Sequence, residues 1–299
     1  MIISYYKKAV ISGNTVQVSD FDKPVMVGYK RKTKKHLPND NLNDINTNDK
    51  QVYLKDKDKA KKRPVDDAKK KEYRRRSYYR AKSNIARLIN SNFNRYPGYS
   101  SKFVTFTFKD NVTDISIANK EWHKFIKRLN RAIGYKVKYV VVIEFQKRGA
   151  IHYHCVFFNL PLIPVTDYMA KLWAINSNVN VTLSSLWGNG FVKVNRIDNI
   201  KNVGSYVSKY LSKNIDDDRL AGKKTYFCSQ GLYKPITVIN AEAEYVESCF
   251  TLEDLKYKNS YKNEYNTISI RIYNDNSNLY DSYLRKKDNI ISKFRNLRC

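Results

Sequence analysis

The order of elements along the chain predicts an α+β domain: an antiparallel sheet with helices on one face, in a ferredoxin-like or split-βαβ layout. Alternation of apolar and polar residues predicts strands, and apolar residues at helical spacing predict helices. Across residues 103–214 these patterns follow the order β-α-β-β-α-β-α. In that topology the first and third strands are central neighbours in the sheet. The predicted strands lie at 103–109, 137–158 (a hairpin) and 191–197, and the helices at 115–133, 167–174 and 200–214.

Two of these elements have especially clear patterns. Residues 103–109 read FVTFTFK, which alternates with the period of two expected of a strand. The helix at 115–133 carries an aromatic and aliphatic stripe that we expect to lie in the core rather than in a ligand site. The stripe consists of Trp122, Phe125, Ile126, Leu129 and Ile133.

The hairpin at 137–158 carries two of the chain's four histidines. Strand alternation points His152 and His154 to one face of the sheet and Tyr153 to the other. Residues 147–149 read Lys-Arg-Gly, which suits a short hairpin loop with glycine at its left-handed position. That loop places Glu144 opposite His152 on the same face, whereas a shift of one residue would turn Glu144 away.

Glu144, His152 and His154 together predict a divalent metal site with open coordination positions. Mixed nitrogen and oxygen donors suit Mg²⁺ or Mn²⁺, and imidazole makes Mn²⁺ the better match. Two histidines and a carboxylate also describe the facial triad of non-haem iron oxygenases, but the strongly basic arm and the tyrosine-lysine helix have no role in that chemistry.

The helix at 200–214 supplies candidate nucleophiles. Tyr206 and Tyr210 are four residues apart and project from one helical face. Lys209 and Lys213 follow each tyrosine by three residues, so an ammonium is expected beside each phenol. A phenol is a poor nucleophile at neutral pH, and a cation beside it favours the phenolate. With a metal ion on a scissile phosphate, this set predicts transesterification that leaves a 5′-phosphotyrosine and a free 3′-hydroxyl.

The charge of the chain predicts a polyanionic partner. The net charge is +28, and the segment 55–82 is especially rich in lysine and arginine. Nucleic acid is the first expectation and an anionic membrane surface the second. A helix is predicted to begin at Asp66–Asp67 and to end near Asn90, as a DNA-binding arm. No apolar run is long enough for a membrane span, no secretion signal opens the chain, and scattered cysteines favour a reduced, cytoplasmic setting.

The composition divides the chain into four parts. Residues 1–30 are predicted to be an N-terminal β segment, and 31–95 a basic linker and helix. Residues 96–236 would hold the catalytic domain, and 237–299 a C-terminal extension of unknown role, with a strand at 267–273 and a basic helix at 279–298.

The motifs together resemble those of the HUH endonucleases. His152-Tyr153-His154 is similar to their His-hydrophobic-His signature, 103–108 to their first motif and 206–213 to their tyrosine motif. The histidines precede the tyrosines, as in rolling-circle replication initiators, and YVSKYLSK and the segment 222–235 are similar to initiators of small phages and of plasmids from low-GC bacteria. The resemblance covers about residues 80–236.

The resemblance implies an initiator (Rep) that nicks one strand of a single-stranded or unwound DNA origin in a bacterial host cell and later rejoins it. It implies Glu144, His152 and His154 as metal ligands and Tyr206 and Tyr210 as nucleophiles, with Tyr206 favoured for the first cut. The chain has no G-x-x-x-x-G-K-[ST] phosphate loop, so a host helicase is expected as a partner. A transposase with the same chemistry and a non-catalytic basic nucleic-acid-binding protein are the alternatives.

Overall fold

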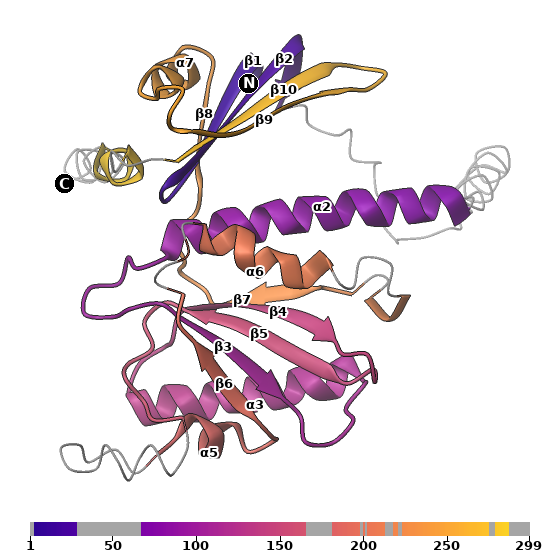
Figure 1. The fold of residues 1–299 in the computed structure, drawn as a ribbon, viewed down its shortest axis with the longest axis vertical. Helices are drawn as coiled ribbons and strands as arrows, with labels where there is room; N and C mark the ends of the chain where they lie inside the picture. Colours follow the sequence, from indigo (N-terminus) through magenta and orange to yellow (C-terminus); the bar gives the residue numbers. More distant parts are fainter. Residues whose placement is uncertain are drawn as a thin grey trace, which may run out of the picture.

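The chain folds into two antiparallel five-stranded sheets joined by a long helix (Figure 1). A computed structural model describes residues 3–28, 67–165, 181–197, 200, 202–212, 218–220, 223–274 and 279–286. We call the sheet with strand order β6-β3-β5-β4-β7 the histidine sheet, and the sheet with order β8-β1-β2-β10-β9 the terminal sheet. The predicted α+β class with an antiparallel sheet is confirmed.

The histidine sheet has the predicted split-βαβ order. Strand β5 pairs with β3 on one side and with β4 on the other, so the histidine strand lies inside the sheet as expected. Helix α3 connects β3 to β4 across β5. The strands are β3 (Lys102–Thr107), β4 (Tyr139–Phe145), β5 (Ile151–Phe157), β6 (Val192–Asn195) and β7 (Tyr226–Cys228).

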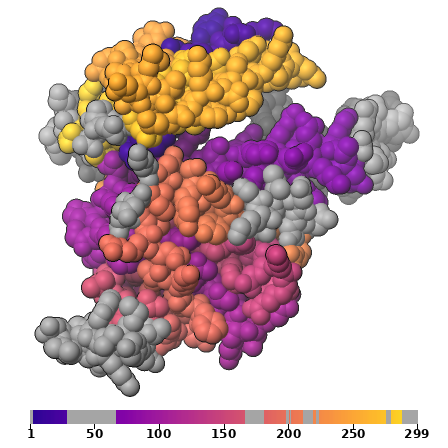
Figure 2. Space-filling view, viewed as in Figure 1, coloured from indigo at the N-terminus to yellow at the C-terminus, as the bar shows by residue number. Residues whose placement is uncertain are grey.

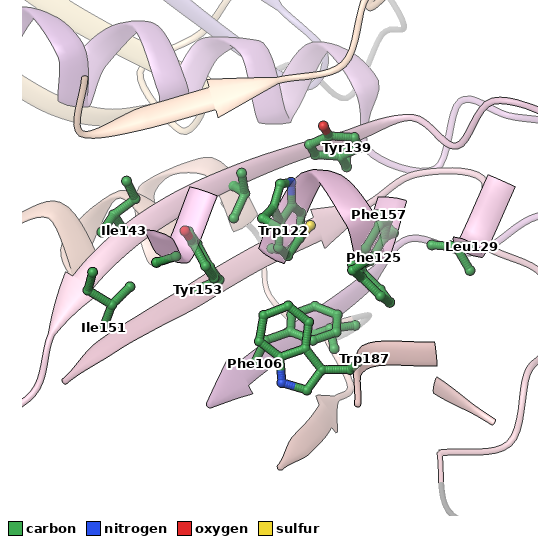
Figure 3. Packing of buried hydrophobic residues seen from close by; sticks show 14 of the residues in the cluster. Phe106, Trp122, Phe125, Leu129, Tyr139, Ile143, Ile151, Tyr153, Phe157 and Trp187 are labelled. Carbon is green, nitrogen blue, oxygen red and sulfur yellow. The ribbon is translucent and has the colours of Figure 1, made fainter. Parts of the chain in front are cut away.

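An aromatic core packs one face of the histidine sheet against helices α3 (Ile115–Ile133) and α5 (Leu183–Trp187). Trp122 and Trp187 are fully buried and contact Phe106 of β3 (Figure 3). The predicted bounds of α3 are those observed, because Asp114 caps its first turn and Gly134 adopts the left-handed conformation that ends it. This packing supports β5 from the side opposite its histidines.

Helices also cover the second face of the histidine sheet, so the expectation that this face stays open was wrong. Helices α2 (Asp67–Asn92) and α6 (Val203–Ser212) lie over it (Figure 1). Ile85 and Val207 form a second core there with residues such as Val142. Strand β4 is buried along its whole length, and its sequence YVVVIEF is a nearly continuous apolar run of the kind found in strands covered on both faces.

The terminal sheet combines the two ends of the chain. It consists of β1 (Ile3–Ser12), β2 (Thr15–Val27), β8 (Ile236–Ile239), β9 (Leu255–Lys262) and β10 (Thr267–Asn274). Helix α7 (Ala241–Ser248) and the helical residues 279–286 pack on one face. The predicted N-terminal β segment and C-terminal extension thus share a sheet, while the proposed domain boundaries themselves stay a prediction.

Some predicted elements lie wholly or partly outside the described residues. The helix expected at 167–174 is among them, and the C-terminal helix is described only over 279–286. The strand predicted at 267–273 is β10, whereas its partner β9 was not predicted. Among the described residues, no helix combines the length and the apolar character needed to cross a membrane.

A network of ion pairs links α7 to the terminal sheet. Glu247 accepts hydrogen bonds from Arg271, from Lys7 and from the Tyr273 hydroxyl, and Asp20 also contacts both cations. Burial raises the pKa of Glu247, but the hydrogen bonds and charges of Arg271 and Lys7 outweigh burial, so its pKa is lowered overall.

Candidate active site

The hairpin between β4 and β5 has the register that the sequence predicts. Gln146 N donates to Ala150 O at 2.8 Å, and Gly149 has a φ of 90°, the left-handed conformation expected at this loop position. Glu144 therefore pairs directly with His152. The prediction that these two residues share one face of the sheet is confirmed.

Glu144 and His154 are in direct contact at the centre of this face. The Nε2 atom of His154 is hydrogen-bonded to the Glu144 carboxylate, and both side chains are buried. On the other side of the imidazole, Thr105 Oγ1 of β3 lies 3.1 Å from His154 Nδ1. A hydrogen bond at the second ring nitrogen is the usual way in which a histidine ligand is oriented. Thr105 is a site residue that the sequence interpretation missed.

His152 lies beside this pair but does not complete a compact cluster. Its side chain is partly exposed, and the centroid of its ring is 6.1 Å from that of His154. Within the described ranges, no three His, Cys, Asp or Glu side chains are grouped closely enough to hold a metal ion. The structure thus brings Glu144 and His154 into contact and places His152 on the same face.

Helix α6 places both candidate tyrosines over this face. The ring of Tyr210 stacks on the imidazole of His154, with centroids 4.0 Å apart and planes inclined by 25°. The hydroxyls of Tyr206 and Tyr210 are 3.3 Å apart. The buried ring of Phe103 contacts His154 and both tyrosines, with centroid distances of 5.9, 5.8 and 5.5 Å. The histidine strand and the tyrosine helix therefore meet at one site, as expected.

The position of α6 depends on a close contact with α2. A Cβ atom on Gly204 would lie 2.1 Å from the carbonyl oxygen of Ala86, so only glycine permits this approach. The amide of Gly204 donates to Oδ1 of buried Asn90 at 2.9 Å, and Asn90 Nδ2 donates to Asn202 at 3.1 Å. These contacts fix the height and rotation of α6 above the sheet, and hence the position of its tyrosines.

An open pocket of about 610 Å³ lies at the hairpin end of this face. It contains the carboxylate and both imidazoles together with Tyr210, whereas Tyr206 is not part of its lining. Exposed Lys147 and Arg148 of the loop form a basic rim, which the sequence interpretation used only as turn residues. The lining consists of Glu144, Gln146, Lys147, Arg148, His152, His154 and Tyr210.

The environment keeps the Tyr210 phenol protonated at neutral pH. Burial is the main cause that raises the pKa of Tyr210, and the hydrogen bond with Tyr206 and the charge of Glu144 add to it. Lys209 was expected beside the Tyr206 hydroxyl, but its side chain is exposed and contacts neither phenol within the described part of the chain. The second predicted lysine, Lys213, lies outside the described residues.

The predicted basic arm is helix α2, whose N-terminal half is exposed and projects beyond α6 (Figure 1). Two of its cations are paired with acidic side chains of the same helix, Lys70 with Asp67 and Arg76 with Glu72. Exposed pairs of this kind contribute little to stability. The remaining excess of lysine and arginine is presented to solvent, as expected for a nucleic-acid-binding helix.

Comparison with known proteins points to DNA replication. Residues 101–215 match the model of a family described as a replication-associated protein of the ORF2 type. The phasyl DNA replicon protein arp of Escherichia coli is 31% identical over 126 residues, which cover 38% of this chain and 44% of that protein. The chain thus spans less than half the length of this curated relative. No solved structure matches the chain. The two matches support the role of a replication initiator.

Proposed function

We propose that this protein is a rolling-circle replication initiator that nicks one DNA strand at an origin through a tyrosine nucleophile of the HUH type. The observation that carries the proposal is the stacking of Tyr210 on His154, which is itself hydrogen-bonded to Glu144. A phenol, an imidazole and a carboxylate meet in one open pocket with a basic rim. The similarity of residues 101–215 to a replication-associated family supports replication as the context.

The residues present suit a divalent metal ion. Glu144 and His154 already converge on one point, and His152 adds a second imidazole from the same face and the same pocket. We infer that these three side chains hold Mn²⁺ or Mg²⁺. When bound, the ion would neutralise charge on the scissile phosphate and favour departure of the 3′ oxygen.

The reaction follows from the positions of the side chains. The Tyr210 hydroxyl attacks phosphorus, the bond from phosphorus to the 3′ oxygen breaks, and that oxygen leaves as the 3′-hydroxyl after gaining a proton. Because the Tyr210 phenol is protonated at neutral pH, its proton must leave during attack, and the Tyr206 hydroxyl at 3.3 Å is the neighbouring acceptor. Lys147 and Arg148 at the rim would hold the phosphates of the bound strand.

Tyr210 is the better-placed candidate for the first cut, although the sequence favoured Tyr206. Tyr210 lines the pocket together with all three proposed ligands, and Tyr206 contacts it from outside that lining. Tyr206 would assist Tyr210 and accept the strand in a later transfer, which rejoins the DNA. Lys209 and Lys213 would act on the bound strand rather than on a phenol, since Lys209 points to solvent.

The alternatives differ in substrate or in chemistry. A transposase would use the same site on the ends of a mobile element, and the similarity to replication proteins favours an origin instead. A non-catalytic basic DNA-binding protein would leave the conjunction of Tyr210, His154 and Glu144 without a role. A host helicase is proposed as a partner, because the chain carries no phosphate-binding loop of its own.

The proposal is tested with labelled single-stranded DNA that carries the candidate origin. Purified protein is incubated with Mn²⁺, with Mg²⁺ or with EDTA, and the products are separated on a denaturing gel. We expect a metal-dependent, SDS-resistant protein–DNA adduct that disappears when both Tyr206 and Tyr210 are replaced by phenylalanine. Metal-independent cleavage, or an adduct that survives in the double variant, would contradict the proposed chemistry.

A further inference from the structure

The edge strand β9 of the terminal sheet presents two exposed tyrosines in a fixed arrangement. All its residues after Leu255 are exposed. Strand alternation places Tyr257 and Tyr261 on one face with Asn259 between them. The tyrosine hydroxyls are 2.7 Å apart, and the Asn259 amide donates to them at 3.0 and 3.2 Å. These bonds hold two aromatic rings in place on the surface, 41% and 48% exposed, respectively.

The tyrosine face of β9 is the face of the sheet that looks toward helix α2. Ile272 of β10 pairs with Tyr257 on one side and with Gln17 of β2 on the other, so all three share a face. Gln17 accepts a hydrogen bond at 2.8 Å from Arg87 of α2. The opposite face is covered by α7. Figure 2 shows the surface hollowed between the terminal sheet and α2, and we call this region the α2–sheet cleft.

Helix α2 lines the other side of the α2–sheet cleft with positive charge. Arg80 lies two helical turns before Arg87 and Arg76 one further turn before it, so the three guanidinium groups share the face that looks toward the sheet. Lys8 of β1 adds a fourth cation beside Arg87. Burial and the charge of Arg87 lower the pKa of Lys8, and neither residue forms an ion pair with a described acidic side chain. An anion in the cleft would relieve this repulsion.

We propose that the α2–sheet cleft is a binding site for single-stranded DNA, separate from the tyrosine-histidine pocket. Bases would stack on Tyr257 and Tyr261, while Arg80, Arg87 and Lys8 contact the phosphates. Aromatic platforms combined with a positive groove are the general means of binding an unpaired strand. A protein partner is disfavoured, since the cations would require acidic neighbours and the net charge of +28 favours a polyanion. The inference rests on the proposed function for the identity of the polymer as DNA.

The test measures binding without cleavage. The full-length protein in EDTA is titrated into a fluorescein-labelled oligonucleotide of about 16 nucleotides, a length in the range of known single-strand sites. The double variant Tyr257→Ala/Tyr261→Ala is expected to raise Kd at least about 10-fold, since stacking on one aromatic ring contributes roughly 1–3 kcal/mol per base. Arg80→Gln is expected to reduce the slope of log Kd against log salt by about 0.7.

Tyr245→Ala is the matched control, because Tyr245 is an exposed tyrosine of α7 on the far side of the terminal sheet. The control should bind as the wild type does, and thermal unfolding should show that all variants are folded. The loss in the double variant should be larger for single-stranded than for duplex DNA. Equal losses on both, or an affinity of the double variant equal to that of Tyr245→Ala, would overturn the proposal and leave the tyrosines as a candidate protein-binding patch.

The same variants separate this inference from the proposed function. If the wild type binds single strands in a Tyr257- and Tyr261-dependent way but forms no covalent adduct, the proposed nicking function fails and the cleft stands. If the adduct forms while the double variant binds DNA normally, the cleft fails and the nicking function stands.

Discussion

The ring of Tyr210 lies on the imidazole of His154 with centroids 4.0 Å apart, and the same imidazole is hydrogen-bonded to Glu144. The two aromatic residues come from α6 and from β5, which are separated by about fifty residues of sequence. A nucleophile and two proposed metal ligands are thereby assembled from a helix and a hairpin that pack on the same face of one sheet. Substitutions can test both what this assembly does and what holds it together.

The two tyrosines should differ in their contribution to strand cleavage. Tyr210→Phe removes the proposed attacking oxygen and is expected to lower the rate of adduct formation at least ~1,000-fold. Tyr206→Phe removes only a neutral hydrogen bond to Tyr210 and is expected to cost about 2–10-fold in the same step. Single-turnover cleavage of labelled single-stranded origin DNA measures both rates. A larger loss in Tyr206→Phe than in Tyr210→Phe would reverse the roles proposed for them.

Loss of the Glu144 carboxylate should abolish metal-dependent cleavage without unfolding the protein. Glu144→Gln keeps the shape of the side chain but removes the charge that would hold a divalent ion. A metal ion stabilises the transition state by several kcal/mol, so a loss of at least about 100-fold is expected. Glu253→Gln, at an exposed position of the terminal-sheet region, controls for the loss of one negative charge.

Titration of Mn²⁺ into both variants then separates binding from chemistry. Half-maximal cleavage by Glu253→Gln should need the same metal concentration as the wild type, whereas Glu144→Gln should not reach wild-type rates at any concentration. Wild-type cleavage by Glu144→Gln at high metal would show that the carboxylate is not a required ligand.

The contact between α2 and α6 should be intolerant of a single methyl group. In Gly204→Ala the added Cβ would lie 2.1 Å from Ala86 O and 2.7 Å from Asn90 Oδ1, so the helices must separate. We expect a loss of about 1–3 kcal/mol in the free energy of unfolding. Because α6 carries Tyr210, cleavage should fall as well. Ser205→Ala, at the adjacent exposed position, should leave unfolding and cleavage near wild type.

The ion-pair network of Glu247 should make the terminal sheet sensitive to acid. The pKa of Glu247 is lowered in the folded protein, so its contribution to stability is present above the unfolded pKa of about 4.3 and is lost as the pH falls through the folded value. Glu247→Gln is expected to cost about 2 kcal/mol at pH 7. The difference from wild type should shrink below about pH 4. A difference that stays constant down to about pH 3, measured by chemical denaturation, would contradict this account.

The sequence predicted the site well because its determinants are local. The loop at 147–149 fixes the register of the hairpin, and strand alternation then places Glu144, His152 and His154 on one face. Helical spacing likewise predicts that Tyr206 and Tyr210 share a side of α6. The aromatic stripe of α3, expected in the core, includes Trp122, which is fully buried.

Contacts between distant segments could not be predicted in the same way. Nothing local to α6 shows that Gly204 would fit against Ala86, which brings α6 onto a face that was expected to be open. Strand β9 was missed because its alternating lysines and tyrosines bury no face. The orientation of His154 by Thr105 follows from the pairing of β3 with β5, and the predicted strand order would have been enough to find it.

The most direct test of the central claim is to identify the residue that carries the DNA. The covalent adduct formed by the wild type in Mn²⁺ is digested with nuclease and protease, and the nucleotide-modified peptide is sequenced by mass spectrometry. The account predicts a phosphodiester on the Tyr210 hydroxyl, with Tyr206 modified only when a second strand is supplied for transfer. Modification of a serine, a histidine or a tyrosine outside α6, or cleavage with no modified peptide at all, would contradict it.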